Sequence, residues 1–290
     1  MKNRKIEGFM GLTHTLLSIS LLLVCILIPF EPFQLTFGKL RESWILMVAG
    51  LTVCVGGALF PDLDNDQSSA GHTLGVLGSI FTIFMKSTSS IVWNVYHFKA
   101  DQRPTTQHRY LWHAPIIGLG LCLLFYFGLP TGEYTIFTNL SNSIQTGQIS
   151  YFFQTNAILT LFIILMFMAI LVGANMILYR LGNIFPIPPF VKYIFPVLML
   201  GYIFTTTYTN LKILGVCFGA GYLFHCLEDC FADTGIPSLI FPIPQFWRNK
   251  VWGRMRLTPI TIETGSMMNT VLDFIALGVM IFLLVIVFRG

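Results

Sequence analysis

Long apolar runs separated by short polar stretches organise this chain. A helix needs about 20 mostly apolar residues to cross a bilayer. Seven segments approach that length: 7–30, 43–61, 113–130, 156–180, 190–208, 211–228 and 269–288. The pattern therefore predicts an all-α, polytopic membrane protein with about seven transmembrane helices. Little more than Asn210 separates the fifth segment from the sixth, which predicts a helical hairpin there.

Residues 71–97 fit this pattern less well. The run from Thr73 to Met85 is apolar but short for a span, and the polar residues from Ser87 to Ser90 interrupt it. Such a segment is typical of an interfacial or re-entrant helix rather than a crossing. Whether it crosses stays open.

Composition supports a membrane protein. Hydrophobic residues make up 54% of the 290 residues and charged residues 10%, against about 25% charged in ordinary soluble domains. The net charge of +4 lies in a few polar loops, which fits positive-inside anchoring and predicts no nucleic-acid partner. We expect one membrane domain over residues 1–290, with polar loop regions at 62–112 and 229–268.

Charge also predicts the orientation. Lys2, Arg4 and Lys5 precede the first segment and are expected in the cytoplasm. If 71–97 does not cross, the stretch 131–155, which has no Lys or Arg, lies outside. Every His and acidic motif then reaches the cytoplasmic face, so we expect one shared site there.

Two acidic residues follow the second apolar segment, where Asp62 and Asp64 come directly after Pro61. Alternate spacing in an extended turn lets two carboxylates converge on one cation. A solvated helix end explains the same pattern equally well.

Two histidines stand at the mouth of the third segment, in His108-Arg109-x-x-x-His113. Histidine is the usual nitrogen ligand of zinc, and the planar fork of Arg109 suits a phosphate. The alternative is an interfacial belt, in which Tyr110 and Trp112 lie at headgroup level.

The sixth segment ends in a His and Asp pair. His225 and Asp229 are one helical turn apart on one face, which is the geometry of two ligands for one metal ion. Glu228 is a candidate general base, or it holds a ligand histidine in its tautomer. His14 lies within the first segment, where an interior neutral histidine bonded to Thr13 is the alternative to a ligand.

Six cysteines lie in or beside the apolar runs without the spacing of a disulfide scaffold, and we expect them to be buried small hydrophobes. Cys226 and Cys230 point about 100° away from the His225 and Asp229 face, so we do not expect them to be ligands.

Together these motifs resemble the YdjM-like bacterial inner-membrane proteins, a family of metal-dependent hydrolases. The resemblance is carried by Gly11-Leu12-Thr13-His14, by Leu59 to Asp64 with Ser68, by His108-Arg109-x-x-x-His113, and by Gly221-Tyr222-Leu223-x-His225-x-x-x-Asp229 continuing to Pro242. The stretch 131–215 carries no motif and is expected to be a helical insertion. Tyr110, Trp112 and Ala114 depart from the small Gly, Thr and Ser of the family pattern, which implies a bulkier site mouth.

The resemblance implies an all-helical fold distantly akin to zinc-dependent phospholipases C and nucleases. It also implies one to three divalent ions, with zinc expected first and manganese as another possibility. The implied ligands are His14, Asp62, Asp64, His108, His113, His225 and Asp229.

Two functions are consistent with this set. The first is hydrolysis of a phosphoester by a metal-activated water, with Arg109 and Glu228 as catalytic residues and a membrane lipid or another amphiphile as substrate. The second is a transporter or ion-binding protein that uses the same site. The expected location is the bacterial inner membrane, with the site near the cytoplasmic face.

Overall fold

The computed structural model describes residues 8–65, 69–96, 111–150, 152, 156–184, 187–188, 190–231 and 267–289. Helices form nearly all of this part of the chain, and no β-strand occurs in it, so the all-α prediction is confirmed there. The α-helices are α1 (Gly8–Leu27), α2 (Glu31–Thr36), α3 (Trp44–Leu59), α4 (Ser69–Leu74), α5 (Val76–Tyr96), α6 (Pro115–Gly128), α7 (Ile136–Gln145), α9 (Ala157–Ile184), α10 (Val191–Thr205), α11 (Tyr208–Asp229) and α12 (Met267–Arg289). The 3-10 helices are η1 (Gly38–Glu42), η2 (Pro61–Asp64) and η4 (Leu111–His113).

Four described segments are long and apolar enough to cross a membrane, which indicates a membrane protein. They are Trp44–Asp64, Ala157–Tyr179, Tyr208–Asp229 and Thr270–Arg289. All seven predicted segments are helical, but the predicted count of about seven spans is not confirmed. The apolar helices Leu12–Leu27, Pro115–Gly128 and Tyr193–Thr205 are shorter. At about 1.5 Å per residue, α6 with its 14 residues reaches about 21 Å, less than the hydrocarbon thickness of about 30 Å.

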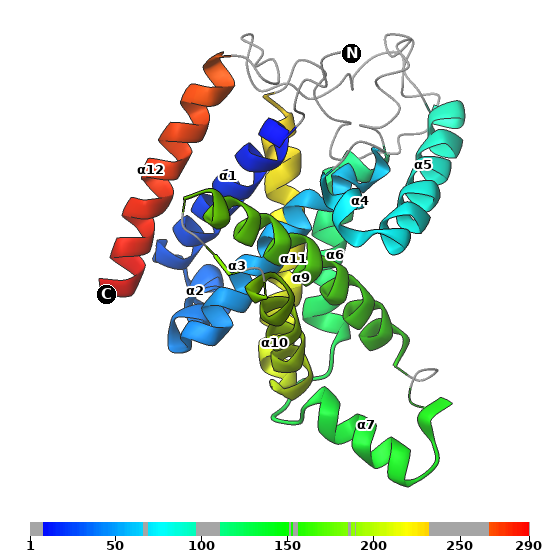
Figure 1. Cartoon of the computed structure of the whole chain (residues 1–290). Helices are drawn as coiled ribbons and strands as arrows, with labels where there is room; N and C mark the ends of the chain where they lie inside the picture. The colour runs from blue at the N-terminus through cyan, green and yellow to red at the C-terminus, as the bar shows by residue number, and fades with distance from the viewer. Residues whose placement is uncertain are drawn as a thin grey trace.

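Helix α3 lies at the centre and packs against α9 on one side and α11 on another (Figure 1). Glycines allow these close contacts. A Cβ at Gly56 would lie 2.1 Å from the carbonyl oxygen of Ala169 in α9, and a Cβ at Gly221 of α11 would lie 2.0 Å from that of Cys54 in α3. Small residues at helix contacts are the usual means of close packing in membranes. The result is a tight three-helix centre that fixes the ends of α3 and α11 relative to each other.

Helices α1 and α12 lie side by side along one flank of the bundle (Figure 1). Thr13 Oγ1 donates a hydrogen bond of 2.7 Å to the buried Asp273 Oδ1 of α12. Ser20 Oγ lies 3.4 Å from the carbonyl oxygen of Ala276. These polar contacts hold the first and last helices together in apolar surroundings.

Three further predictions concern the hairpin, the helical insertion and the segment after α3. The predicted hairpin of α10 and α11 is wrong, because α10 packs against α9 instead of folding back along α11. The stretch predicted as a helical insertion contains α9, which packs against α3 in the same hydrophobic core, and α7, which lies at the far end of the bundle (Figure 1). The described part of the segment predicted at 71–97, up to Tyr96, lies in α4 and α5, which meet at Gly75 with a φ of +56°.

Candidate metal centre

The end of α11 supplies two side chains to the site. Thr207 caps the start of this helix, where its side chain accepts a hydrogen bond from the Asn210 N–H, and the helix continues to Asp229. His225 and Asp229 therefore lie one turn apart on a buried face, with 3.4 Å between His225 Nε2 and Asp229 Oδ2. This is the paired arrangement that the sequence predicted.

The turn η2 supplies the acidic pair after α3. Pro61 begins this 3-10 turn, and the turn brings Asp62 and Asp64 to the end of α11. Asp62 Oδ1 lies 3.8 Å from His225 Nε2 and 3.6 Å from His113 Nε2. Asp64 is fully buried, and its Oδ2 lies 4.0 Å from His113 Nδ1, on the other edge of that imidazole ring.

His113 ends the short helix η4, which two larger helices hold in place. Tyr222 of α11 donates its hydroxyl to the carbonyl oxygen of Trp112, and Cys226 Sγ lies 3.4 Å from the carbonyl oxygen of His113. The Trp112 indole Nε1 donates to the Met85 carbonyl oxygen of α5 at 3.1 Å. These contacts present the His113 ring to Asp229, with 3.4 Å between His113 Nε2 and Asp229 Oδ2.

Four atoms from three elements alternate between histidine and aspartate, so that each His nitrogen lies near both Asp oxygens: His113 Nε2, His225 Nε2, Asp62 Oδ1 and Asp229 Oδ2. Their four His-to-Asp distances are 3.6, 3.4, 3.8 and 3.4 Å. Ligands about 2.0–2.1 Å from a tetrahedral zinc ion lie about 3.3–3.4 Å from one another. The four measured distances lie near this value, and one ligand atom each from His113, His225 and Asp229 lies within 4.8 Å of the other two.

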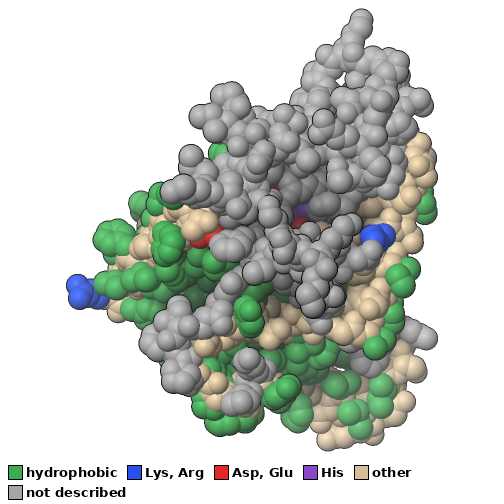
Figure 2. All heavy atoms as spheres, turned by 45° about the horizontal axis from the view of Figure 1, so that its top comes forward, with side chains coloured by type: hydrophobic (Ala, Val, Ile, Leu, Met, Phe, Trp, Pro, Cys, Tyr) green, Lys and Arg blue, Asp and Glu red, His purple; other side chains and the backbone are tan. Residues whose placement is uncertain are grey.

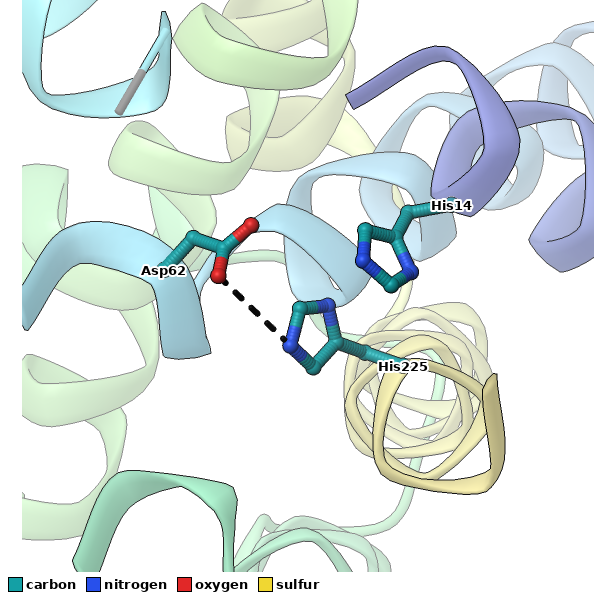
Figure 3. A group of neighbouring side chains, drawn as sticks. All are labelled: His14, Asp62 and His225. Carbon is teal, nitrogen blue, oxygen red and sulfur yellow. Dashed lines mark ion pairs between the residues drawn. The ribbon is translucent and has the colours of Figure 1, made fainter. Parts of the chain in front are cut away.

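His14 extends the cluster from the side of α1. Its Nδ1 contacts Glu228 Oε2, and its Nε2 lies 3.9 Å from Asp229 Oδ1. The His14 and His225 rings are 4.1 Å apart between centroids. Figure 3 shows the side chains of His14, Asp62 and His225 pointing toward one another from α1, η2 and α11.

Two groups of three residues have the proximity that a metal ion requires: His14 with Asp62 and His225, and His113 with His225 and Asp229. His225 belongs to both. The buried His and Asp residues could therefore hold a metal ion. Neither Cys226 nor Cys230 belongs to either group of described residues.

Burial and charge determine the protonation of His113 and the exposure of the side chains in the cluster. Burial lowers the pKa of His113 below its usual value, more than the carboxylates of Asp62, Asp64 and Asp229 raise it. Neutral imidazole is the form that binds metals. The Asp62 side chain is 16% exposed, whereas those of His113 and His225 are fully buried. The cluster is therefore more open to its surroundings on the side of Asp62. Figure 2 shows histidine and acidic side chains near the centre of one face of the molecule.

The structure brings together His14, Asp62, Asp64, His113, His225, Glu228 and Asp229. The other two predicted site residues, His108 and Arg109, lie outside the described residues. Thr13 was considered as a partner of His14, but its hydroxyl donates to Asp273. Asp273 is an acidic residue within the last apolar segment, and that position was the signal in the sequence that could have predicted this contact. Tyr222 and Trp112 were also missed as anchors of His113.

No known protein family, curated protein or solved structure matches the chain. The resemblance to YdjM-like proteins therefore remains a prediction that rests on the four motifs.

Proposed function

We propose that this protein is a membrane-embedded, metal-dependent hydrolase that cleaves a phosphoester bond in an amphiphilic substrate. The observation that carries the proposal is the convergence of His113 Nε2, His225 Nε2, Asp62 Oδ1 and Asp229 Oδ2 within 3.4–3.8 Å across each His and Asp pair. Histidine nitrogens and carboxylate oxygens suit zinc, and manganese is the next candidate. Three protein ligands, such as His113, His225 and Asp229, would leave the fourth position of a tetrahedral ion for water. When bound, a divalent ion lowers the pKa of its water toward about 7 and so supplies a hydroxide nucleophile.

The remaining two carboxylates contact two histidines of the cluster. Asp64 faces His113 Nδ1 and Glu228 contacts His14 Nδ1, each on the ring edge away from Asp229. Carboxylates in this position fix the tautomer and the orientation of ligand histidines. We therefore assign Asp64 and Glu228 to holding His113 and His14, in preference to a role for Glu228 as the general base.

Access favours the side of Asp62. It is the most exposed of the four converging side chains, so a substrate phosphoryl group would reach the site there. Arg109 remains a predicted phosphoryl-binding residue. An amphiphilic substrate suits a site that lies at the ends of apolar, membrane-spanning helices.

Metal analysis of detergent-purified protein tests the site. Wild type should carry stoichiometric zinc or manganese by mass spectrometry, and Asp62→Asn and His225→Ala should each lose most of it. Cys217→Ala is a matched control, because Cys217 is a buried residue on α11 outside both metal groups. If both site variants keep the full metal content of wild type, the proposed metal centre is wrong.

Hydrolysis assays test the activity. With added zinc or manganese, wild type should cleave a phospholipid or a nucleotide phosphodiester, and His225→Ala should not. If wild type holds stoichiometric metal but cleaves no ester, the hydrolase proposal is wrong. Zinc uptake into proteoliposomes that depends on His225 would then support the alternative, a transporter.

A further inference from the structure

Helix α5 has its polarity reversed. Its buried positions recur at helical spacing and are small, polar or flexible: Gly78, Thr82, Met85 and Ser89. Five of the nine exposed positions described on this helix carry large apolar side chains that are 54% to 78% exposed: Val76, Ile80, Ile83, Phe84 and Ile91. The other four are Ser79, Lys86, Ser87 and Asn94. An amphipathic helix surrounded by water turns its apolar side inward. The reversal indicates that the surroundings of α5 are apolar.

The outward face of α12 shows the same character. Large apolar side chains such as Phe274 and Phe282 are 70% and 64% exposed on this helix, which is long and apolar enough to cross a membrane. Helix α5 also lies on the outside of the bundle, beside α4 (Figure 1). Its outward face therefore matches that of a helix expected to contact lipid.

One charged residue sets how deeply α5 can lie. Lys86 is the only charged residue in the sequence of α5, and it is exposed near the middle of the helix. A lysine stem can lie along apolar surface while its ammonium group reaches the headgroups. This favours a helix held at the level of one leaflet over a helix that crosses the bilayer, and α5 is not among the four candidate spans.

The buried side of α5 packs directly on the candidate metal centre. It contacts η2, which carries Asp62, and η4, which carries His113. Trp112 joins the two elements, since its Nε1 donates to the Met85 carbonyl oxygen at 3.1 Å and to Thr88 Oγ1 at 2.9 Å. The Phe84 ring lies 6.1 Å from the Trp112 ring, so the apolar face begins next to the site.

We propose that α5 lies within one leaflet with its outward face against phospholipid acyl chains, and that it guides such a lipid laterally to the metal centre. The second part rests on the proposed hydrolase function. Lateral guidance narrows the substrate class to lipids that reach Asp62 from within the bilayer. The acyl chains of such a lipid would lie along the side of α5 that carries Ile83.

Spin labels test the first part without any activity. Ile83→Cys and Ile80→Cys are labelled in lipid nanodiscs, and accessibility to oxygen is compared with accessibility to a water-soluble nickel complex. Phe282→Cys on α12 is the lipid-facing reference, and unmutated protein gives the background from native cysteines. We expect both α5 labels to collide with oxygen at least several-fold more than with nickel. Nickel accessibility would overturn the proposal, and shielding from both reagents would overturn it in favour of a protein partner.

Hydrolysis by Ile83→Asp tests the second part. A carboxylate on the outward face should lower cleavage of a long-chain phospholipid in nanodiscs by at least tenfold. Metal content and cleavage of a water-soluble phosphodiester should stay near wild type, because Ile83 points away from the site. Equal loss on both substrates would overturn lateral access. If wild type cleaves neither substrate, the hydrolase proposal fails together with lateral access, whereas the spin labels decide lipid contact on their own.

Discussion

Gly221→Ala tests whether the contact between α3 and α11 sets the geometry of the metal centre. The added Cβ would lie 2.0 Å from the Cys54 carbonyl oxygen, whereas real Cβ contacts essentially never fall below 3.0 Å. The interior is close-packed and the obstacle is backbone, so the two helices must separate by about 1 Å. Gly221 lies one turn before His225, and the displacement therefore reaches the ligands.

The expected magnitude is set by the ligand distances. If α11 moves as a rigid unit, the gap of 3.8 Å between His225 Nε2 and Asp62 Oδ1 grows to about 4.8 Å. Two ligands about 2.1 Å from one zinc ion can lie no more than about 4.2 Å apart. We expect Gly221→Ala to bind zinc at least ten times more weakly than wild type in a competition titration with a chelator.

A matched control separates this effect from a general loss of helix packing. Gly120→Ala on α6 adds the same methyl group in open space, with no atom within 4 Å, and should bind zinc as wild type does. Both variants should run as single species on size exclusion. If Gly221→Ala is well folded and keeps wild-type zinc affinity, α3–α11 packing does not control the site and the reasoning is refuted.

Three further outcomes are expected. Glu228→Gln should weaken zinc binding by about 10–100-fold in the same titration, because the carboxylate that orients His14 is lost, and unchanged affinity would contradict that role. Tyr222→Phe leaves the Trp112 carbonyl oxygen without its hydroxyl donor, so the free energy of unfolding measured in detergent should fall by about 1–3 kcal/mol. An unchanged free energy of unfolding would argue against the role of Tyr222 in holding η4 and His113 in place. Chelation of wild type should lower the melting temperature, and the shift should disappear in a His225→Ala background if the metal binds where we propose.

The apolar pattern was enough to predict the apolar helices and their order, but it did not predict α2 or α7. Hydropathy measures which segments are apolar, and every predicted span coincides with a helix. It does not fix where a helix starts. Pro115 begins α6 late and Pro196 lies inside α10, so both helices are shorter or less regular than their apolar runs.

The gathering of the site residues was also predictable. Each predicted motif lies where an apolar run begins or ends, and alternate crossings of a membrane bring such ends to one side. The described members do meet, with His225 next to both Asp62 and His113. The roles of the side chains were harder to predict from the sequence, because they depend on how each helix is rotated about its axis. The sequence left two roles open for Glu228, a general base or a residue that holds a ligand histidine, and it did not indicate which histidine Glu228 contacts. In the structure Glu228 contacts His14, and Asp229 lies near both His113 and His14.

The charges of the cluster support the proposal of a bound cation. Asp62, Asp64, Glu228 and Asp229 bring four carboxyl groups into a mostly buried space with three histidines. Buried carboxylates are costly unless positive charge lies beside them. Protonated histidine could supply it, but burial lowers the pKa of His113 and so favours its neutral form. A divalent ion would supply the positive charge and leave the imidazoles neutral as ligands.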